Sequence, residues 1–264
     1  PRMPTISGLR RRGVTPEAIR DFCEKIGVSK ANSRVDSSLL DHCIRDDLKA
    51  KTPVAMAVLR PLKVTITNYP EGQIEFLPVE NNPENEALGI REVPFGPELY
   101  IEQEDFMEVP EKKYFRLAPG KEVRLKGAYY ITCTGVVKDG DGKITEVLCT
   151  YDPETKSGSG FEGRKVKGTL HWVCADTAID AEVRLYDAMM LDNDEDPSGD
   201  MIMNPNSLEV LSSKVEPSIK DAKGGDRFQF MRNGYFCVDT KTSTPQKLVF
   251  NRIVALKSAY KPGK

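Results

Sequence analysis

Apolar residues recur at helical spacing near the start of the chain. Between residues 19 and 26 they lie three or four positions apart, and Thr15-Pro16 provides the cap and the first-turn proline that open a helix. Gly27 ends this run. A second apolar stripe occupies residues 37–49, and Pro53 follows it. Residues 1–51 are therefore predicted to form a short helical part.

After residue 53 the pattern changes to short runs in which apolar and polar positions alternate, as in half-buried strands. Asp139-Gly140-Asp141-Gly142 predicts a hairpin, because Asp-Gly pairs adopt the positive φ that tight turns need. The predicted strands cover residues 58–67, 122–126, 129–134, 144–151, 163–173, 181–185, 208–211, 227–231, 234–238 and 248–256. Short strands at regular spacing predict β-barrels and not a parallel sheet with crossover helices.

Charge is segregated along the 264 residues, although the total is close to neutral. With 38 basic and 40 acidic residues the net charge is −2, which by itself argues weakly against a nucleic-acid binder. Local patches, however, set the field at a binding surface. Acidic residues gather at 71–92, 98–111 and 187–200, and basic residues at 10–12, 112–126 and 164–167. This separation is typical of a protein with one anion-binding face.

Motifs of catalysis and metal binding are missing from the sequence. The six cysteines form no CxxC pair, and His42 and His171 are too scattered for a cluster, so no metal site is predicted. No phosphate loop, GxGxxG or GxSxG motif occurs. The sequence thus predicts a binding module without a catalytic site, with buried free thiols in a reducing compartment.

The first thirteen residues, PRMPTISGLRRRG, resemble the segment that follows the KMSKS loop in class I aminoacyl-tRNA synthetases of the glutaminyl and eukaryote-type glutamyl group. The resemblance spans essentially the whole chain, and the later segments favour the glutaminyl family. These segments are residues 19–23, 26–28, 91–95, 120–125, 163–168, 171–173, 228–230, 234–237 and 249–252. Anticodon recognition by the C-terminal half of a glutaminyl-tRNA synthetase is what this resemblance implies.

The family architecture is mainly β, a short N-terminal helical subdomain followed by two antiparallel β-barrels. The implied ranges are 1–51 for the helical subdomain, 52–109 with 187–264 for the proximal barrel, and 110–186 for the distal barrel. The HIGH and KMSKS motifs of the catalytic domain do not occur here. The resemblance therefore implies no cofactor in this chain, ATP only in the full-length enzyme, and tRNA(Gln) and an upstream catalytic domain as partners.

Four side chains match family residues that read the anticodon. Arg116 corresponds to the contact with the third base, a guanine, Arg124 to the contact with the first base, and Gln229 to the contact with the central uracil. Arg232 matches a nearby family arginine. These residue types suit the task, because a guanidinium can stack on a base or bond two acceptors, and an amide both donates and accepts.

The chain departs from the family at two other positions of this region. Val54 stands where a family member has a second arginine for the central base, which leaves Gln229 alone there or brings in a neighbour such as Lys51. Lys113 replaces a glutamine and is expected to contact phosphate. Next to it, Tyr114 and Phe115 are candidates either for stacking on bases or for the core.

A second set of residues matches the loop that faces the inside corner of the L-shaped tRNA, together with the basic run before it. The side chains are Lys30, Asn32, Asp36, Arg10, Arg11 and Arg12. The three arginines are expected either to neutralise phosphates or to pair with acidic side chains or the catalytic domain.

Two other interpretations stay open at this point. One is a barrel-type glutamyl-tRNA synthetase, which the opening segment alone does not exclude. The other is a protein-interaction module that uses the barrels as a docking platform, a role that the modest net charge permits. No segment approaches the ~20 apolar residues of a membrane span and no secretory leader opens the chain, so a cytoplasmic monomer without membrane contact is expected.

Overall fold

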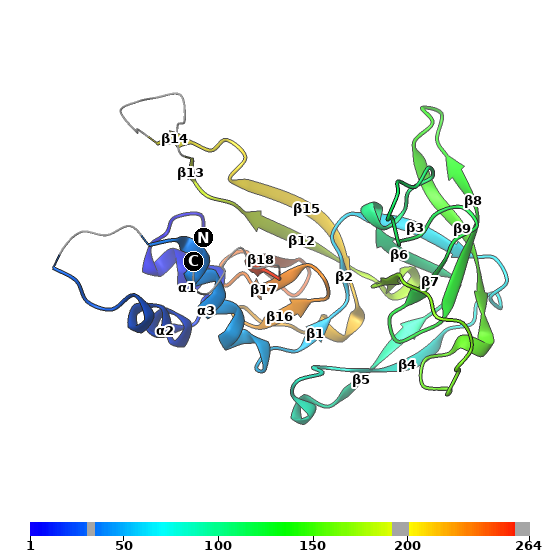
Figure 1. The fold of residues 1–264 in the computed structure, drawn as a ribbon, viewed down its shortest axis with the longest axis horizontal. Helices are drawn as coiled ribbons and strands as arrows, with labels where there is room; N and C mark the ends of the chain where they lie inside the picture. The colour runs from blue at the N-terminus through cyan, green and yellow to red at the C-terminus, as the bar shows by residue number, and fades with distance from the viewer. Residues whose placement is uncertain (31–34, 192–200, 257–264) are drawn as a thin grey trace.

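The computed structural model describes residues 1–30, 35–191 and 201–256. The molecule is elongated, with three helices at one end and two barrel-like sheets following along its long axis (Figure 1). The predicted fold class, mainly β with a small helical part and two barrels, is confirmed. None of the described helices is long and apolar enough to cross a membrane.

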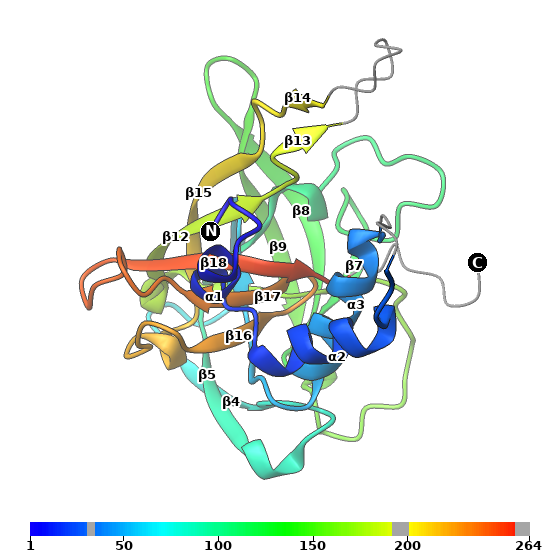
Figure 2. The ribbon, with the colours of Figure 1, turned by 90° about the vertical axis from the view of Figure 1, so that its left-hand side faces the viewer.

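Helices α1 (Ile6–Arg12), α2 (Pro16–Ile26) and α3 (Ser37–Lys49) begin at side-chain caps. The hydroxyls of Thr5 and Thr15 accept from backbone amides in the first turns of α1 and α2, and the Asp36 carboxylate accepts from the Ser38 amide. Gly13, with φ 106°, ends α1. Figure 2 shows the helices beside the last strands of the chain. Apolar side chains of the helices, Ile44 and Leu48 among them, pack there against Tyr235 and Ile253.

Seven strands form the first sheet, and its two edges almost meet. The order is β1 (Val54–Ala55), β16 (Arg227–Phe230), β17 (Gly234–Val238), β18 (Leu248–Ala255), β12 (Ile179–Tyr186), β15 (Leu208–Val215) and β2 (Ala57–Val58). Because only Met56 separates β1 from β2, the sheet curls until its edges approach each other. Phe230, Phe236 and Phe250 fill its interior.

The second sheet also has seven strands. Their order is β10 (Thr169–Leu170), β7 (Glu122–Leu125), β8 (Tyr130–Lys138), β9 (Ile144–Asp152), β3 (Pro61–Ile66), β6 (Glu98–Glu102) and β11 (Val173–Cys174). Its core surrounds Trp172, which is fully buried and meets Phe95 edge-on at 5.1 Å. The indole Nε1 donates to the Lys126 carbonyl at 2.9 Å.

Two hairpins extend from the sheets, β4 (Glu75–Glu80) with β5 (Ile90–Phe95) and β13 (Met190–Leu191) with β14 (Ile202–Met203). The turn predicted at residues 139–142 joins β8 to β9, and Gly142 supplies the positive φ, at 79°. Four pairings among the described strands are parallel, namely β1 with β16, β7 with β10, β12 with β18 and β3 with β9. Each sheet is therefore mixed.

The strand prediction failed in two places. Strands β4, β5 and β6 lie where the sequence showed only an acidic segment, because their glutamates occupy mainly the solvent side while residues such as Leu77 and Val79 are buried. Residues 163–173 were predicted as one strand but provide only β10 and β11. Of the stretch before β10, only the Gly168 carbonyl joins the neighbouring strand, accepting from the Arg124 amide at 2.9 Å.

Sheet membership changes at other positions than the predicted domain limits. Strands β3 and β6 fall in the predicted proximal range 52–109 but pair within the second sheet, and β12 falls in the distal range 110–186 but pairs within the first. The chain crosses between the sheets in the short link from β2 to β3 and again between β11 and β12. Alternation identifies a strand without naming its partner, so these crossings were not visible in the sequence.

Candidate nucleic-acid interface

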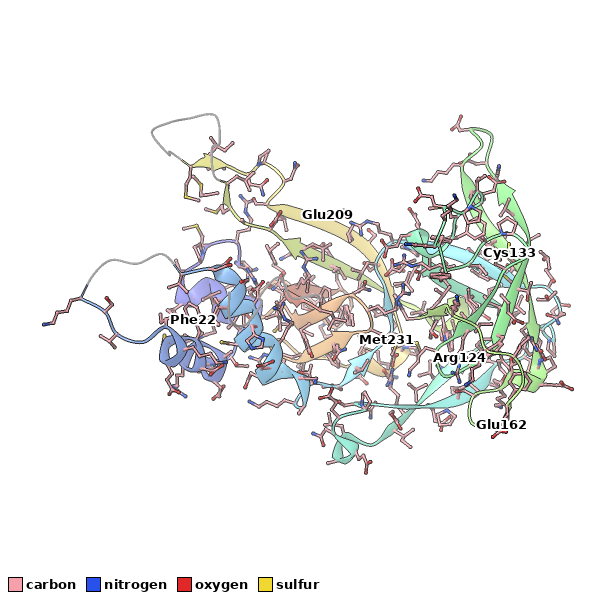
Figure 3. All side chains as sticks on the ribbon, in the orientation of Figure 1. Phe22, Arg124, Cys133, Glu162, Glu209 and Met231 are labelled. Atoms are coloured by element: carbon pink, nitrogen blue, oxygen red, sulfur yellow. The ribbon has the colours of Figure 1, made fainter. Side chains whose placement is uncertain are left out.

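Three adjoining pockets lie on the two barrels, two of them lined by residues of both barrels and the third by residues of the second barrel alone. We name them the Arg116, Gln229 and Arg124 pockets, with volumes of about 590, 450 and 550 Å³. Thr169 lines all three, and Arg124 lines both of the last two. Met231, Arg124 and Glu162 follow one another along this side of the molecule (Figure 3). Side chains that are over one hundred positions apart in sequence thus share one continuous surface.

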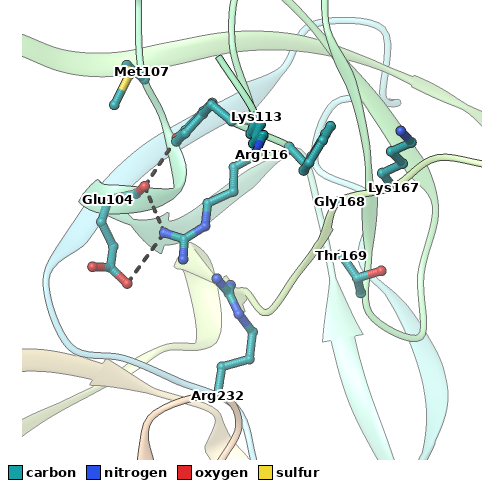
Figure 4. A pocket seen from close by; sticks show the side chains of 10 residues that line it. Glu104, Met107, Lys113, Arg116, Lys167, Gly168, Thr169 and Arg232 are labelled. Carbon is teal, nitrogen blue, oxygen red and sulfur yellow. Dashed lines mark hydrogen bonds and ion pairs between the residues drawn. The ribbon is translucent and has the colours of Figure 1, made fainter. Parts of the chain in front are cut away.

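The Arg116 pocket combines several cations with one aromatic face. Its lining includes Lys113, Phe115, Arg116, Lys167 and Arg232. Phe115 is 52% exposed, and the Lys167 ammonium lies 4.8 Å from its ring centroid, so this ring is on the surface and not in the core. The guanidinium groups of Arg116 and Arg232 point toward each other across the pocket (Figure 4).

The backbone around the Arg116 pocket is locally strained. Among the described non-glycine residues, Lys113 (φ 73°) and Arg232 (φ 66°) have positive φ, and both line this pocket. A left-handed backbone is unfavourable for residues with a Cβ and is found disproportionately at functional sites, where the surrounding structure enforces it. Neither the backbone strain nor the presence of these two residues in one pocket was apparent from the sequence.

The Gln229 pocket forms between β16, β1 and the β4–β5 hairpin. Gln229 pairs with Val54 across the parallel β1–β16 ladder, and the backbone amide of Gln229 donates to the Pro53 carbonyl at 2.9 Å. Arg124 and Lys126 reach the same pocket from the second barrel. Two cations therefore lie near Gln229 although Val54 replaces the family arginine.

Lys51, considered in the sequence analysis as a substitute for that arginine, makes a different contact. Its ammonium forms an ion pair with Asp47 one helical turn away, and it does not line the Gln229 pocket. Lys51 lies just after the end of α3 at Lys49, and its side chain returns along the helix to Asp47. Lys126 is the lysine that the fold brings to this pocket.

Two arginines line the Arg124 pocket, and only Arg164 of the two is paired with carboxylates among the described residues. Arg164 contacts the carboxylates of Glu122 and Asp152, at 2.5 and 2.7 Å, and these bonds raise the pKa of Arg164. Arg124 is exposed and has no carboxylate within ion-pair distance among the described residues, and its guanidinium carbon lies 6.0 Å from the Tyr130 ring centroid. Arg124 is thus available to a negatively charged or π-stacking ligand.

The second predicted set of residues lies at the helical end of the molecule. Arg11 forms a two-bond ion pair with the buried Asp239, and Arg12 donates twice to the Ile253 carbonyl, so both support the fold. Of the alternatives for the basic run, pairing with an acidic side chain applies to Arg11, whereas Arg12 binds a backbone carbonyl. Arg10 and Lys30 are exposed.

The remaining two members of that set differ in what can be described. Asp36 is exposed and caps α3, and the hydrogen bonds from Ser38 lower its pKa. Asn32 lies outside the described residues.

Sequence reasoning missed several side chains of the pockets. Lys126 and Lys167 belong to the two basic segments, whose clustering was visible, but their pockets were not. Asp105, which contacts both Arg116 and Arg232, lies in the acidic segment 98–111 and carried no signal of its own.

Comparison with known families matches both barrels. The family described as "tRNA synthetases class I (E and Q), anti-codon binding domain" matches residues 53–152 with one sequence model and residues 169–239 with a second. Together the matched ranges cover more than half of the chain and contain Arg116, Arg124, Gln229 and Arg232.

Individual curated proteins give the same result. The chain is 60% identical to the glutamine–tRNA ligase of Clostridioides difficile (strain 630), with 100% of this chain and 48% of that protein aligned. It is 59% identical to the ligase of Clostridium perfringens, over 99% and 48%, and 52% identical to that of Rhodopirellula baltica, over 98% and 44%. The chain thus spans about half the length of these relatives. With both barrels matched by the family, this chain belongs to the class I (E and Q) tRNA synthetases and contains their anticodon-binding domains.

Proposed function

We propose that this chain recognises the anticodon of tRNA(Gln) by taking one unstacked base into each of the three adjoining pockets. The observation that carries the proposal is the convergence of Arg116, Gln229 and Arg124 on one continuous surface. Single-stranded RNA loops expose the pairing edges of their bases, and proteins read these edges with hydrogen bonds while cations hold the phosphates. Three neighbouring pockets, each large enough to hold a base and each lined by at least one cation, suit a trinucleotide.

Each pocket has donors and acceptors suited to its base. In the Arg116 pocket, a guanidinium can donate to the O6 and N7 acceptors of guanine. In the Gln229 pocket, the amide can donate to a uracil carbonyl and accept from the uracil N3–H. In the Arg124 pocket, an uncompensated guanidinium beside Tyr130 can stack on the first base or contact its phosphate. Exposed Phe115 adds a stacking surface beside the guanine.

Glutamine specificity is part of the proposal and is supported by the relatives, which carry the name glutamine–tRNA ligase at up to 60% identity. Ligation of glutamine with ATP would then be carried out by polypeptide outside these 264 residues, with this chain supplying the tRNA selection. The chain would act as a monomer in the cytoplasm, joined to a catalytic domain.

Replacing Arg116 by alanine is expected to abolish discrimination at the third base. The chain should bind tRNA(Gln) about thirtyfold more tightly than the same tRNA with adenine at that position, since a two-bond arginine–guanine contact contributes about 1–3 kcal/mol, or about 5- to 150-fold. Arg116→Ala should bring this ratio close to 1 and leave first-base discrimination intact. Arg124→Ala should do the reverse. Fluorescence anisotropy with each anticodon base changed in turn measures both ratios.

Arg20→Ala is the matched control, because Arg20 is exposed on α2 and far from the pockets in sequence and fold. It should bind every tRNA like the unaltered chain. Equal affinity of the unaltered chain for all anticodon variants would rule out base recognition and favour a docking platform. Tighter binding of a glutamate tRNA would move the chain to the glutamyl branch of the family.

Binding should weaken steeply with salt, because phosphates held by lysines release counterions. Lys113, Lys126, Lys165 and Lys167 line the pockets, so log K against log salt is expected to fall with a slope of about −3. Lys167→Ala should reduce the slope by about 1 and weaken all anticodon variants equally. Titrations at several salt concentrations measure this, and a slope near zero would contradict the phosphate contacts.

A further inference from the structure

Asp105 is a buried carboxylate placed between two arginines of the Arg116 pocket. It is fully buried at the end of the 3-10 turn η2 (Gln103–Asp105), just after β6. Its Oδ2 and Oδ1 accept from the two terminal nitrogens of Arg232, at 2.6 and 2.7 Å. Its Oδ1 also lies 3.3 Å from a terminal nitrogen of Arg116. One carboxylate therefore serves both guanidinium groups.

This contact joins the two barrels at the pocket. Arg232 belongs to the turn between β16 and β17 in the first sheet, whereas Asp105 follows β6 and Arg116 precedes β7, two strands of the second sheet. The bidentate pair also holds Arg232 where its backbone is left-handed, with φ 66°. A fork-to-fork ion pair fixes the orientation of a guanidinium plane as well as its position. The first barrel thus presents an arginine in a defined orientation to a pocket of the second.

Arg232 also contacts His171, which in turn contacts Glu102. A terminal nitrogen of Arg232 lies 3.3 Å from His171 Nδ1, and His171 Nε2 lies 3.2 Å from Glu102 Oε1. Because Arg232 can only donate, Nδ1 must accept, so the proton is on Nε2 and is donated to Glu102. Burial raises the pKa of Glu102, but bonds from His171 and from the amides of Leu59 and Arg60 outweigh this and lower it. Glu102 therefore stays ionised and fixes this tautomer.

The two arginines would repel each other without the carboxylate. Both guanidinium groups lie within ion-pair distance of the same carboxylate and are therefore close to each other. Like charges at short range repel most strongly where water is scarce, and a buried anion between them offsets the repulsion. The Glu104 carboxylate also lies near Arg116, with its Oε1 3.5 Å from a terminal nitrogen, but this side chain is 73% exposed. Solvent therefore weakens its attraction to Arg116. Side chains of Arg116 and Arg232 stay 38% and 30% exposed, so each keeps N–H groups directed to the pocket.

We propose that Asp105 is a positioning residue that fixes Arg116 and Arg232 as a two-arginine clamp and so sets selectivity for guanine at the third anticodon position. The inference rests on the proposed function, because it assumes that a base enters this pocket. A guanine presents two acceptors on one edge, and a pair of fixed guanidinium groups can satisfy both and stack as well. Asp105 touches no base in this arrangement and acts through the arginines.

Asp105→Asn is expected to lower third-base discrimination by about tenfold or more, while first-base discrimination, set by Arg124, changes by less than about twofold. Third-base discrimination is the ratio of the dissociation constants for tRNA(Gln) with adenine and with guanine at that position. A merely structural role would weaken both ratios together. Asp141→Asn, in the exposed β8–β9 turn, is the control and should leave both unchanged. An unchanged third-base ratio in folded Asp105→Asn overturns the proposal.

A second comparison decides the case where Asp105→Asn fails to fold. Removing both members of a buried ion pair is better tolerated than removing one. The variant Asp105→Asn/Arg232→Met is therefore compared with Arg232→Met alone, in which Asp105 still holds Arg116. The double variant should show the lower third-base ratio, and equal ratios overturn the positioning role. Lack of any base discrimination in the unaltered chain would instead refute the proposed function.

Discussion

Asp239→Asn is expected to reduce the free energy of unfolding by about 3–5 kcal/mol, the usual cost of removing one partner of a buried ion pair. Asp239 is fully buried, and every group that contacts its two oxygens is a donor. Hydrogen bonds come from the Arg11 guanidinium, the Asn251 amide, the Thr242 hydroxyl and the backbone amides of Lys241 and Thr242, and the Arg184 guanidinium lies 3.9 Å away. An asparagine would turn its own NH₂ toward donors and leave Arg11 without a counter-charge.

The effect should depend on pH in a defined direction. Burial raises the pKa of Asp239, but the bonds from Arg11, Asn251 and two backbone amides outweigh this and hold it far below the ordinary value of 3.8. A lowered carboxyl pKa adds stability that is fully present above the unfolded-state value and is lost as the pH falls toward the folded-state value. The difference between the unaltered chain and Asp239→Asn should therefore be largest near neutral pH and shrink below about pH 4.

Urea denaturation followed by circular dichroism between pH 7 and pH 3 measures both quantities. Asp180→Asn is the matched control, since Asp180 is 83% exposed and makes a single surface pair with Lys214. Its cost should stay within about 1 kcal/mol. A cost of that size for Asp239→Asn as well would mean that the Asp239 cluster does not anchor α1 to the first barrel.

Gly168→Ala is expected to damage two pockets at once. A Cβ at Gly168 would lie 2.1 Å from the Phe115 carbonyl oxygen, a backbone atom that can move only with its whole segment. Separating these two segments would displace Arg116, next to Phe115, and weaken the hydrogen bond from the Arg124 amide to the Gly168 carbonyl. Overpacking of this kind costs about 1–3 kcal/mol, so the chain should fold with lower stability and misplaced pockets.

Discrimination at both the first and the third base should fall by about tenfold, a signature that neither arginine variant produces alone. The same anisotropy titrations measure it. Gly140→Ala is the control, because a Cβ there would meet no atom within 4 Å. Retention of both ratios by Gly168→Ala would show that the contact between residues 115 and 168 is not needed to shape the pockets.

The sequence by itself determined those helices and turns that depend only on residues close together in the chain. Helix α2 follows from its cap and apolar stripe, α3 follows from its apolar stripe, and the β8–β9 hairpin follows from its Asp-Gly turn. The resemblance to the family selected Arg116, Arg124 and Gln229, and the fold brings these three to adjoining pockets. The roles of these side chains in base recognition remain the prediction that the tRNA titrations test.

Partner choice was decided only by the tertiary structure. The alternation of residues 61–66 predicts a strand, but its pairing with β9 places it in the second barrel. Arg11 and Arg10 look alike in sequence, yet only Arg11 meets Asp239, 228 positions away. Asp105 was one acid among many until the fold placed it against Arg232, 127 positions away. Periodicity and capping act over one turn or one strand, whereas sheet pairing and buried ion pairs depend on which distant segments the core brings together.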